Sequence, residues 1–151
     1  MMLTRSDGTF FSRGCLPYLD QRPDEPDGNS KIHLPVRFLN RDLSIRTLCL
    51  IDTGADWSAL DWSLAQQLGC QDLPSCGEVT YLTRFGRLKG QLFRLGFSIE
   101  AEEGESMEAE GAFWVSEEWT TGISILGFNG FLSHLRFAVD PFKNRFYFGC
   151  G

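Results

Sequence analysis

Residues 48–56 have the sequence LCLIDTGAD, an apolar run that ends abruptly in an acid, a hydroxyl, a glycine and an alanine. This order is typical of a buried strand that leads into a tight turn. An ionised carboxylate at a buried strand end is unfavourable unless it is paired or hydrogen-bonded. We therefore expect the strand to deliver Asp52 into the interior, where it requires a partner.

The residues around this run predict strands. Apolar and polar residues alternate over residues 43–47, and residues 32–39 with a turn at 40–42 predict the partner strand of a hairpin. Further strand-like runs occupy residues 78–83, 91–99, 112–115, 122–127, 136–140 and 145–148. Short helical segments are predicted at residues 62–68, with Asp61 as N-cap and Gly69 as C-terminal glycine, and at 130–135. Many short strands with one or two short helices predict an all-β, barrel-like domain.

Composition limits the classes of partner. The 151 residues support one domain, and the net charge of −6 argues against nucleic acid or an anionic membrane as partner. We interpret the acidic segment 100–111 as a surface turn. No apolar run approaches the roughly 20 residues of a membrane span, and the first residues lack a signal-peptide core, so we expect a cytoplasmic protein.

Cysteine spacing and a polar segment complete this outline. The five cysteines are irregularly spaced without a Cys-x-x-Cys pair, which favours reduced thiols and predicts no metal site. Residues 21–30 combine proline, glycine and acids without a large apolar side chain. We therefore divide the chain into an N-terminal arm or flexible linker, residues 1–30, and a domain, residues 31–151.

Several of these motifs together resemble a known family. The order of IDTGA at 51–55, a hairpin tip near Phe85 and Gly86, ILG at 125–127 and a closing hairpin at 137–148 is similar to the single-domain retropepsin-like aspartic proteases. The resemblance covers roughly residues 31–149. It implies a closed acid-protease-like barrel of retropepsin type that supplies one Asp-Thr-Gly per chain. Two chains would then form a homodimer with one active site on the two-fold axis.

The resemblance also implies roles for individual residues. Asp52, Thr53 and Gly54 would be catalytic. Asp52 and its copy in the second chain would activate water for peptide-bond hydrolysis. The Thr53 hydroxyl would hydrogen-bond across the axis, and the Gly54 N–H would reach the carboxylate. No cofactor or metal is needed. Residues 84–90 would form a flap that closes over a peptide or protein substrate. The substrate-binding residues would be Ala55, Asp56, Phe85, Gly86, Arg87, Leu88, Ile125, Leu126 and Gly127.

Ala55 leads to a further hypothesis. A hydroxyl at this position could donate to the carboxylate and favour its charged form, so alanine should leave the pKa values of the dyad higher and the working pH mildly acidic to neutral. Ile125 and Leu126 are open to a core role or a pocket role. Asp56 is open to an ion pair with an arginine or to a solvent-facing role, and Gly127 would permit close approach of the next helix.

The sequence departs from the family in places. Phe128 and Asn129 follow the ILG run, where retroviral members commonly have arginine first, and the flap lacks their glycine-dense tip. The segment before Lys31 could be autoprocessed, a dimer arm or disordered. A rival hypothesis is a non-catalytic peptide-binding or scaffold domain with the same fold. A phosphate-binding loop of the sugar-kinase and actin type also has an Asp-x-Gly strand end, but it requires two α/β lobes that 151 residues of strand pattern cannot supply.

Overall fold

The computed structural model describes residues 2–22 and 30–150. Its architecture is all-β, as predicted, with a single six-residue α-helix among the described residues. The elements are β1 (Gly14–Pro17), β2 (Ile32–Asn40), β3 (Leu43–Ile51), β4 (Ala59–Leu60), α1 (Trp62–Gln67), η1 (Cys70–Asp72), β5 (Gly77–Thr83), β6 (Gly86–Ile99), β7 (Glu103–Gly104), β8 (Met107–Val115), β9 (Ile125–Leu126), η2 (Leu132–His134), β10 (Leu135–Asp140) and β11 (Arg145–Cys150).

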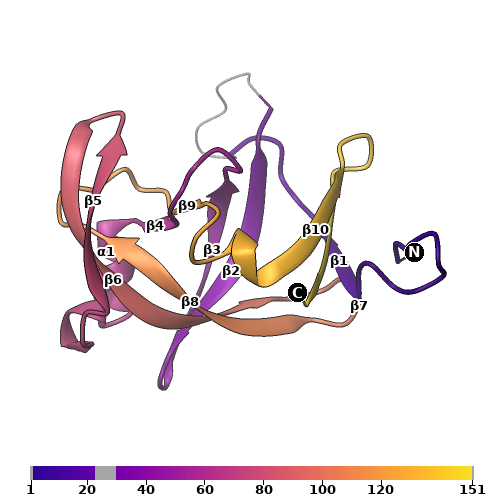
Figure 1. The fold of residues 1–151 in the computed structure, drawn as a ribbon, viewed down its shortest axis with the longest axis horizontal. Coiled ribbons are helices and arrows are strands. Elements are labelled where there is room, and N and C mark those ends of the chain that lie inside the picture. The colour runs from indigo at the N-terminus through magenta and orange to yellow at the C-terminus, as the bar shows by residue number, and fades with distance from the viewer. Residues whose placement is uncertain (1, 23–29, 151) are drawn as a thin grey trace.

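The larger sheet closes on itself. Its seven strands follow the order β2-β3-β9-β4-β8-β6-β5, and β2 also pairs with β6. Six strands therefore form a ring, and β5 extends from it as the outer strand of the β5–β6 hairpin (Figure 1). This ring confirms the predicted closed barrel.

The β2–β3 hairpin brings the apolar run to the barrel interior. The strands pair antiparallel from Ile32↔Ile51 to Asn40↔Leu43, around a turn in which Arg41 adopts φ 54°. Both strands match the predicted ranges closely. Cys49 and Ile51 are both buried, which places the last residue of β3 against the core.

Short strands fix where β3 ends. β9 runs parallel to β3, with Leu50↔Ile125 and Ile51↔Leu126 as pairs, and β4 pairs antiparallel with β9 and parallel with β8. The chain therefore leaves β3 and β9 at the same edge of the barrel. The residues after Ile51 and after Leu126 meet there.

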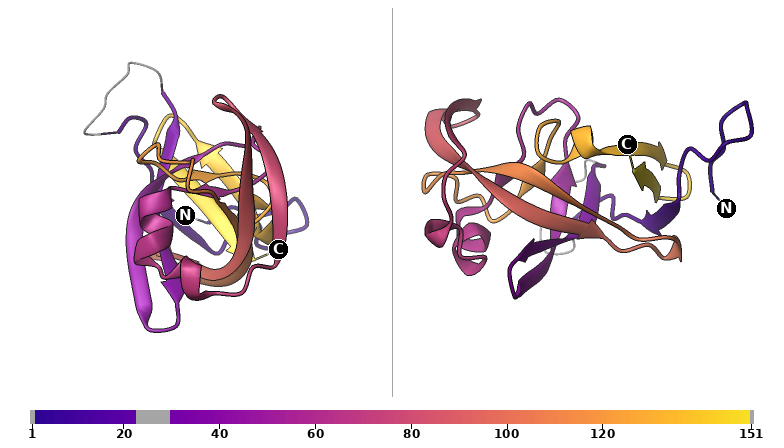
Figure 2. Two further views of the ribbon diagram at one scale, coloured as in Figure 1. Left: turned by 90° about the vertical axis from the view of Figure 1, so that its left-hand side faces the viewer. Right: turned by 60° about the horizontal axis from the view of Figure 1, so that its bottom comes forward.

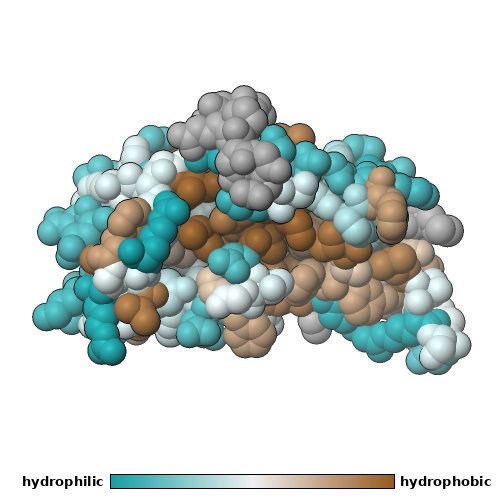
Figure 3. All heavy atoms as spheres, turned by 90° about the horizontal axis from the view of Figure 1, so that it is seen from above, coloured by the Kyte–Doolittle hydropathy of each residue, from teal (hydrophilic) through white to brown (hydrophobic). Residues whose placement is uncertain are grey.

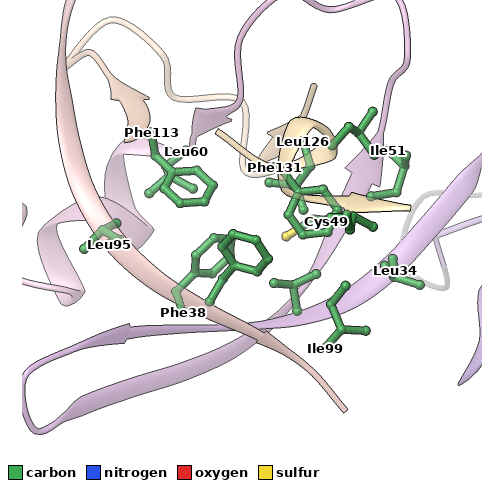
Figure 4. Close-up of a cluster of buried hydrophobic side chains, with 14 of the residues drawn as sticks. Leu34, Phe38, Cys49, Ile51, Leu60, Leu95, Ile99, Phe113, Leu126 and Phe131 are labelled. Atoms are coloured by element: carbon green, nitrogen blue, oxygen red, sulfur yellow. The ribbon is translucent and has the colours of Figure 1, made fainter. Parts of the chain in front are cut away.

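One continuous apolar core fills the barrel (Figure 4). Phe113 packs edge-on against both Phe38 and Phe97, with ring centroids 5.4 and 5.9 Å apart, and Phe97 contacts Phe131 at 4.9 Å. Each such fully buried side chain contributes about 1.5–3 kcal/mol relative to its exposed state. Leu126 is also completely buried in this core.

A smaller sheet lies at the opposite end of the molecule from the β5–β6 hairpin (Figures 1 and 2). Its order is β10-β11-β1-β7, so Gly14–Pro17 pairs with β11 although it precedes the domain boundary predicted at residue 31. Most of the predicted linker, residues 23–29, lies outside the described residues, so the division at residue 31 stays a prediction.

Two predicted loops are strands instead. The acidic segment 100–111 contains β7 and the first part of β8, where Met107 and Gly111 are buried while Glu108 and Glu110 face solvent. Their acids occupy the outer face of an amphipathic strand. Of the predicted flap link at 84–90, Arg84 and Phe85 alone lie outside the strands, because β6 begins at Gly86.

The predicted helix at residues 62–68 is confirmed as α1 (Trp62–Gln67). Asp61 caps it, since its carboxylate accepts a hydrogen bond from the backbone N–H of Ser63 at 3.2 Å. The segment at 130–135 contains the three-residue 3₁₀ turn η2. No helix in residues 2–22 and 30–150 combines the length and apolar character needed to cross a membrane.

Candidate active site

Asp52 is the first residue after β3, and it is exposed rather than buried. Its backbone N–H donates to the Leu126 carbonyl at 3.0 Å, which continues the β3–β9 pairing by one hydrogen bond. The chain then turns, and the Gly54 N–H donates to Asp52 Oδ1 at 2.9 Å. The expectation of a carboxylate in the interior is therefore wrong for the single chain, because the turn lifts the side chain out of the barrel after Ile51.

A second segment holds this turn in place. The Gly127 N–H donates to Ser58 Oγ at 3.0 Å, and Ser58 Oγ lies 3.3 Å from the Gly127 carbonyl, to which it donates in turn. Phe128 N–H donates to the Ala55 carbonyl at 2.9 Å. Ser58 is fully buried, so its two hydrogen bonds with Gly127 are shielded from water. Sequence reasoning missed Ser58, which carries no signal beyond its place six residues after Asp52.

Gly127 has a different role from the predicted one. A Cβ at this position would lie 2.5 Å from the carbonyl oxygens of both Ala55 and Trp57. The glycine therefore permits close approach of the turn after Asp52, not of the following helical segment. Two further bonds join the same segments, because Asn129 donates from its backbone N–H and its Nδ2 to the Asp56 carbonyl, at 2.9 and 2.8 Å. The side chain of Asp56 is exposed.

A groove of about 860 Å³ runs past Asp52. Figure 3 looks onto this end of the molecule, where the tip of the β5–β6 hairpin and the end of β3 lie, and it shows apolar side chains gathered across the middle of the face. The lining residues are Arg22, Lys31, His33, Leu50, Asp52, Gly54, Ala55, Trp57, Ala59, Tyr81, Leu82, Thr83, Arg84, Trp119, Thr121, Ile123 and Ile125.

The predicted site residues separate into three groups. Asp52, Gly54, Ala55 and Ile125 line the groove. Leu126 lies in the barrel core, and Leu88 lies in a second apolar cluster with Ala59, Leu92, Trp114 and Trp119. The other predicted residues, Thr53, Asp56, Phe85, Gly86, Arg87 and Gly127, are not among the lining residues.

The β5–β6 hairpin overhangs the groove. Residues 81–84 on its β5 side line the groove, and the turn consists of Arg84 and Phe85 followed by Gly86 at φ 98°. A positive φ after a two-residue turn is the geometry of a glycine bulge, which glycine adopts without strain. Thr83 Oγ1 stabilises the turn, since it accepts from Phe85 N–H at 3.1 Å and donates to the Gly86 carbonyl at 2.9 Å.

Aromatic side chains form the wall beneath the hairpin. Trp114 contacts Tyr81 and Trp119 edge-on, with centroids 5.5 and 6.3 Å apart, and donates from Nε1 to the Val79 carbonyl at 3.0 Å. Phe85 at the tip reaches Trp119 at 5.9 Å. Burial raises the pKa of Tyr81 above its ordinary value.

The charges on the groove are unequal. Among its described lining residues, Asp52 is the sole acid, whereas Arg22, Lys31 and Arg84 are cationic. His33 is 4% exposed, and its Nδ1 lies 3.3 Å from the Leu19 carbonyl. In the part of the chain that the structure describes, no group of three or more His, Cys, Asp and Glu side chains is placed to hold a metal ion.

Comparison with known proteins shows a likeness to solved structures and to nothing else. No family model and no curated protein matches this sequence. Among solved structures, a retropepsin-like aspartic protease from Rickettsia conorii is similar with a TM-score of 0.49 and 22% sequence identity, covering 89% of this chain and 98% of that chain. At this identity the function has to be inferred from the residues of this chain.

Proposed function

We propose that this chain is one half of an aspartic endopeptidase, in which Asp52 and the Asp52 of a second copy form the catalytic dyad. The observation that carries the proposal is a single exposed carboxylate, held on a well-anchored turn, at a groove whose described lining contains no other acid. Peptide hydrolysis by carboxylates needs one acid and one base, so the second group must come from another molecule.

The chemistry follows from placing two carboxylates close together. They cannot both ionise cheaply, so the pair shares one proton. The ionised member takes a proton from a water molecule, and the oxygen of that water attacks the peptide carbonyl carbon. The protonated member gives its proton to the carbonyl oxygen. As the C–N bond breaks, the amine takes a proton from the dyad and one hydroxyl of the tetrahedral intermediate gives its proton back, which returns the pair to its starting state. Two carboxyl groups and one water are sufficient for this cycle.

Exposure around Asp52 supports the dimer. Asp52, Thr53 and Gly54 are all exposed, although the backbone on either side is anchored in the barrel. Phe128, which is bonded to the same turn through Ala55, is 57% exposed. An apolar ring beside the turn is suited to burial against a second copy, and two-fold dimers are the commonest symmetric assemblies. In this arrangement the Thr53 hydroxyls would hydrogen-bond across the axis.

The hairpin and Ala55 complete the proposal. With its tip above the groove, the β5–β6 hairpin would close over a bound peptide and exclude bulk water. Ala55 brings no hydroxyl to the carboxylate, and the Gly54 N–H is the donor to Asp52. We therefore expect a mildly acidic to neutral optimum, and an optimum near pH 2–3, the range of strongly acidic dyads, would contradict this.

The decisive experiment compares wild type with Asp52→Asn on a mixed peptide library between pH 3 and 8. Asp42→Asn is the matched control, because Asp42 is an exposed acid in the turn at the far end of the same hairpin. We expect cleavage by wild type and Asp42→Asn, and none by Asp52→Asn. Wild type that cleaves nothing, or Asp52→Asn that cleaves equally well, refutes the proposal.

Mixing the proteins tests the shared site. If each active site takes one Asp52 from each copy, excess Asp52→Asn chains form inactive mixed dimers, and the activity per wild-type chain falls as the variant is added. Excess Asp42→Asn should not lower it. Activity that is indifferent to added Asp52→Asn would mean that each chain carries a complete site. Peptide binding by Asp52→Asn and wild type without cleavage by either would instead support the scaffold alternative.

A further inference from the structure

Trp119 carries a hydrogen-bond donor without a partner at the wall of the groove. The side chain lines the groove but is 4% exposed. Its indole Nε1 is buried, and no group in residues 2–22 and 30–150 accepts a hydrogen bond from it. A buried N–H that has lost water and gained no acceptor is unfavourable, so it requires an explanation.

The neighbouring tryptophan shows the contrast. Trp114 belongs to the same apolar cluster, and its Nε1 donates to the Val79 carbonyl at 3.0 Å. The Trp119 backbone is equally well fixed: its N–H donates to the Ser116 carbonyl at 3.0 Å, and its carbonyl accepts from Trp62 N–H, the first residue of α1, at 2.9 Å. The position of the ring is therefore set by the fold, and the indole N–H alone is unused.

The flap tip lies against this ring. Phe85 contacts Trp119 with centroids 5.9 Å apart and an interplanar angle of 65°, yet Phe85 itself is 58% exposed. Trp114 packs on Trp119 from within the cluster, so Phe85 is the contact that a movement of the hairpin tip would remove. Two turn residues followed by Gly86 allow such a movement without disturbing the paired strands.

We propose that the Trp119 indole N–H binds a main-chain carbonyl of the peptide in the groove, and that Phe85 covers this donor until the flap tip lifts. An indole N–H can only donate, and a peptide in an extended conformation offers main-chain carbonyl acceptors along its length. The contact would fix the position of the peptide relative to Asp52 for any side-chain sequence. Trp119 would thus be a binding residue, and the inference rests on the proposed use of the groove for peptides.

Nuclear magnetic resonance of the indole groups tests the donor. The four tryptophans give four indole N–H signals, and Trp119→Phe identifies the one that belongs to Trp119. Using Asp52→Asn, so that no peptide is consumed, we expect the peptide library to move the Trp119 indole proton downfield. The Trp62 signal is the internal control, because Trp62 does not line the groove, and it should stay in place.

Exchange with solvent deuterium tests the cover. We expect the Trp119 indole proton of the unliganded protein to exchange slowly, and Phe85→Ala to speed its exchange at least tenfold. Phe85→Leu, which keeps an apolar side chain of similar reach, should have a smaller effect. Unchanged exchange in Phe85→Ala overturns the proposed cover.

Kinetics separates binding from folding. Trp119→Phe keeps an aromatic ring and removes the N–H, so KM should rise about fivefold to tenfold with kcat nearly unchanged, the size expected for one neutral hydrogen bond. Trp62→Phe, the same change outside the groove, should leave both constants unaltered. A Trp119 indole signal that stays in place at the highest soluble library concentration overturns the proposal. A signal that moves although wild type cleaves nothing supports the inference and refutes the protease, so the two failures are distinguishable.

Discussion

Gly127→Ala offers a sharp test of how the turn after Asp52 is held. The added Cβ would lie 2.5 Å from the carbonyl oxygens of Ala55 and Trp57, about 0.9 Å short of ordinary contact at 3.4 Å. Neither oxygen can rotate away because both belong to the backbone. Overpacking of this kind costs about 1–3 kcal/mol. Displacing the segment also weakens the bonds of Gly127 with Ser58 Oγ and of Phe128 with Ala55, at about 1 kcal/mol each.

We therefore expect Gly127→Ala to lower the free energy of unfolding by about 3–5 kcal/mol. Urea unfolding followed by circular dichroism, at one fixed protein concentration, measures this as a lower midpoint with an unchanged slope. Gly77→Ala is the matched control, because its Cβ would meet Leu92 Cδ1 at an ordinary 3.5 Å. It should stay within about 0.5 kcal/mol of wild type. If Gly127→Ala is as stable as Gly77→Ala, the turn is not held by close packing on Gly127.

Three further predictions concern other contacts. Ser58→Ala should lower the free energy of unfolding in urea by about 1–3 kcal/mol, because it leaves the Gly127 N–H without its acceptor. The control Ser63→Ala, on the exposed face of α1, should lower it by less than about 0.5 kcal/mol. Equal effects of the two variants would contradict this. The hydrogen bond from Arg37 Nε to Glu100 at 2.6 Å holds the pKa of Glu100 below its ordinary value. Glu100 therefore stabilises the folded state at pH values above the pKa that it has in the unfolded chain. This stabilisation is lost as the pH falls through the lowered pKa of the folded state. Wild type should thus exceed Glu100→Gln in urea midpoint at pH 7 and converge with it in strong acid; a constant difference would refute the ion pair. Titration of the native protein with a chromogenic disulfide should label two thiols quickly and three after denaturation: Cys76 and Cys150 are exposed, and Cys15, Cys49 and Cys70 are buried.

Local patterns predicted the elements that local physics determines. The β2–β3 hairpin follows from alternation on either side of a polar turn, and both strands pair over their full length. The N-cap of α1 was predictable for the same reason, since Asp61 needs no distant partner to accept the N–H of Ser63. The same carboxylate also accepts the Gly122 N–H at 2.9 Å, which ties the helix start to a distant loop and which no local pattern reveals.

The prediction from the sequence failed mainly for strands whose outer face is charged. Glu108 and Glu110 were interpreted as part of a solvated turn, yet they alternate with Met107 and Gly111 along β8. β8 is paired with β6 from Ile99↔Met107 to Gln91↔Val115, so tertiary pairing makes a strand of residues whose composition favours a loop. The extension of β6 to Gly86 has the same cause, because β5 supplies the pairing.

The sequence predicted the acid of the candidate site, but it did not predict the residues that surround this acid. Asp52 is marked by the apolar run before it, whereas Ser58 and Trp119 become part of the site through contacts with segments that are distant in sequence. The length of an apolar run and the polarity of the residues after it also do not reveal whether the next carboxylate points into the barrel or out of it. The exposure of the Asp52 side chain is the more informative finding, because it means that the chain can fold before the proposed site is assembled.

Because Asp52 is exposed, a single chain can fold without burying this carboxylate, so the barrel does not bear the desolvation of a buried charge. Under the proposed function, the desolvation cost arises when a second copy brings its own carboxylate to the two-fold axis. A proton shared between the two carboxylates lowers that cost. The anchored turn matters at this step, since bonds to Ser58 and from Phe128 leave little freedom for the two carboxylates to avoid one another. Under the proposed function, the rigidity that Gly127 and Ser58 provide therefore serves the dyad as well as the fold.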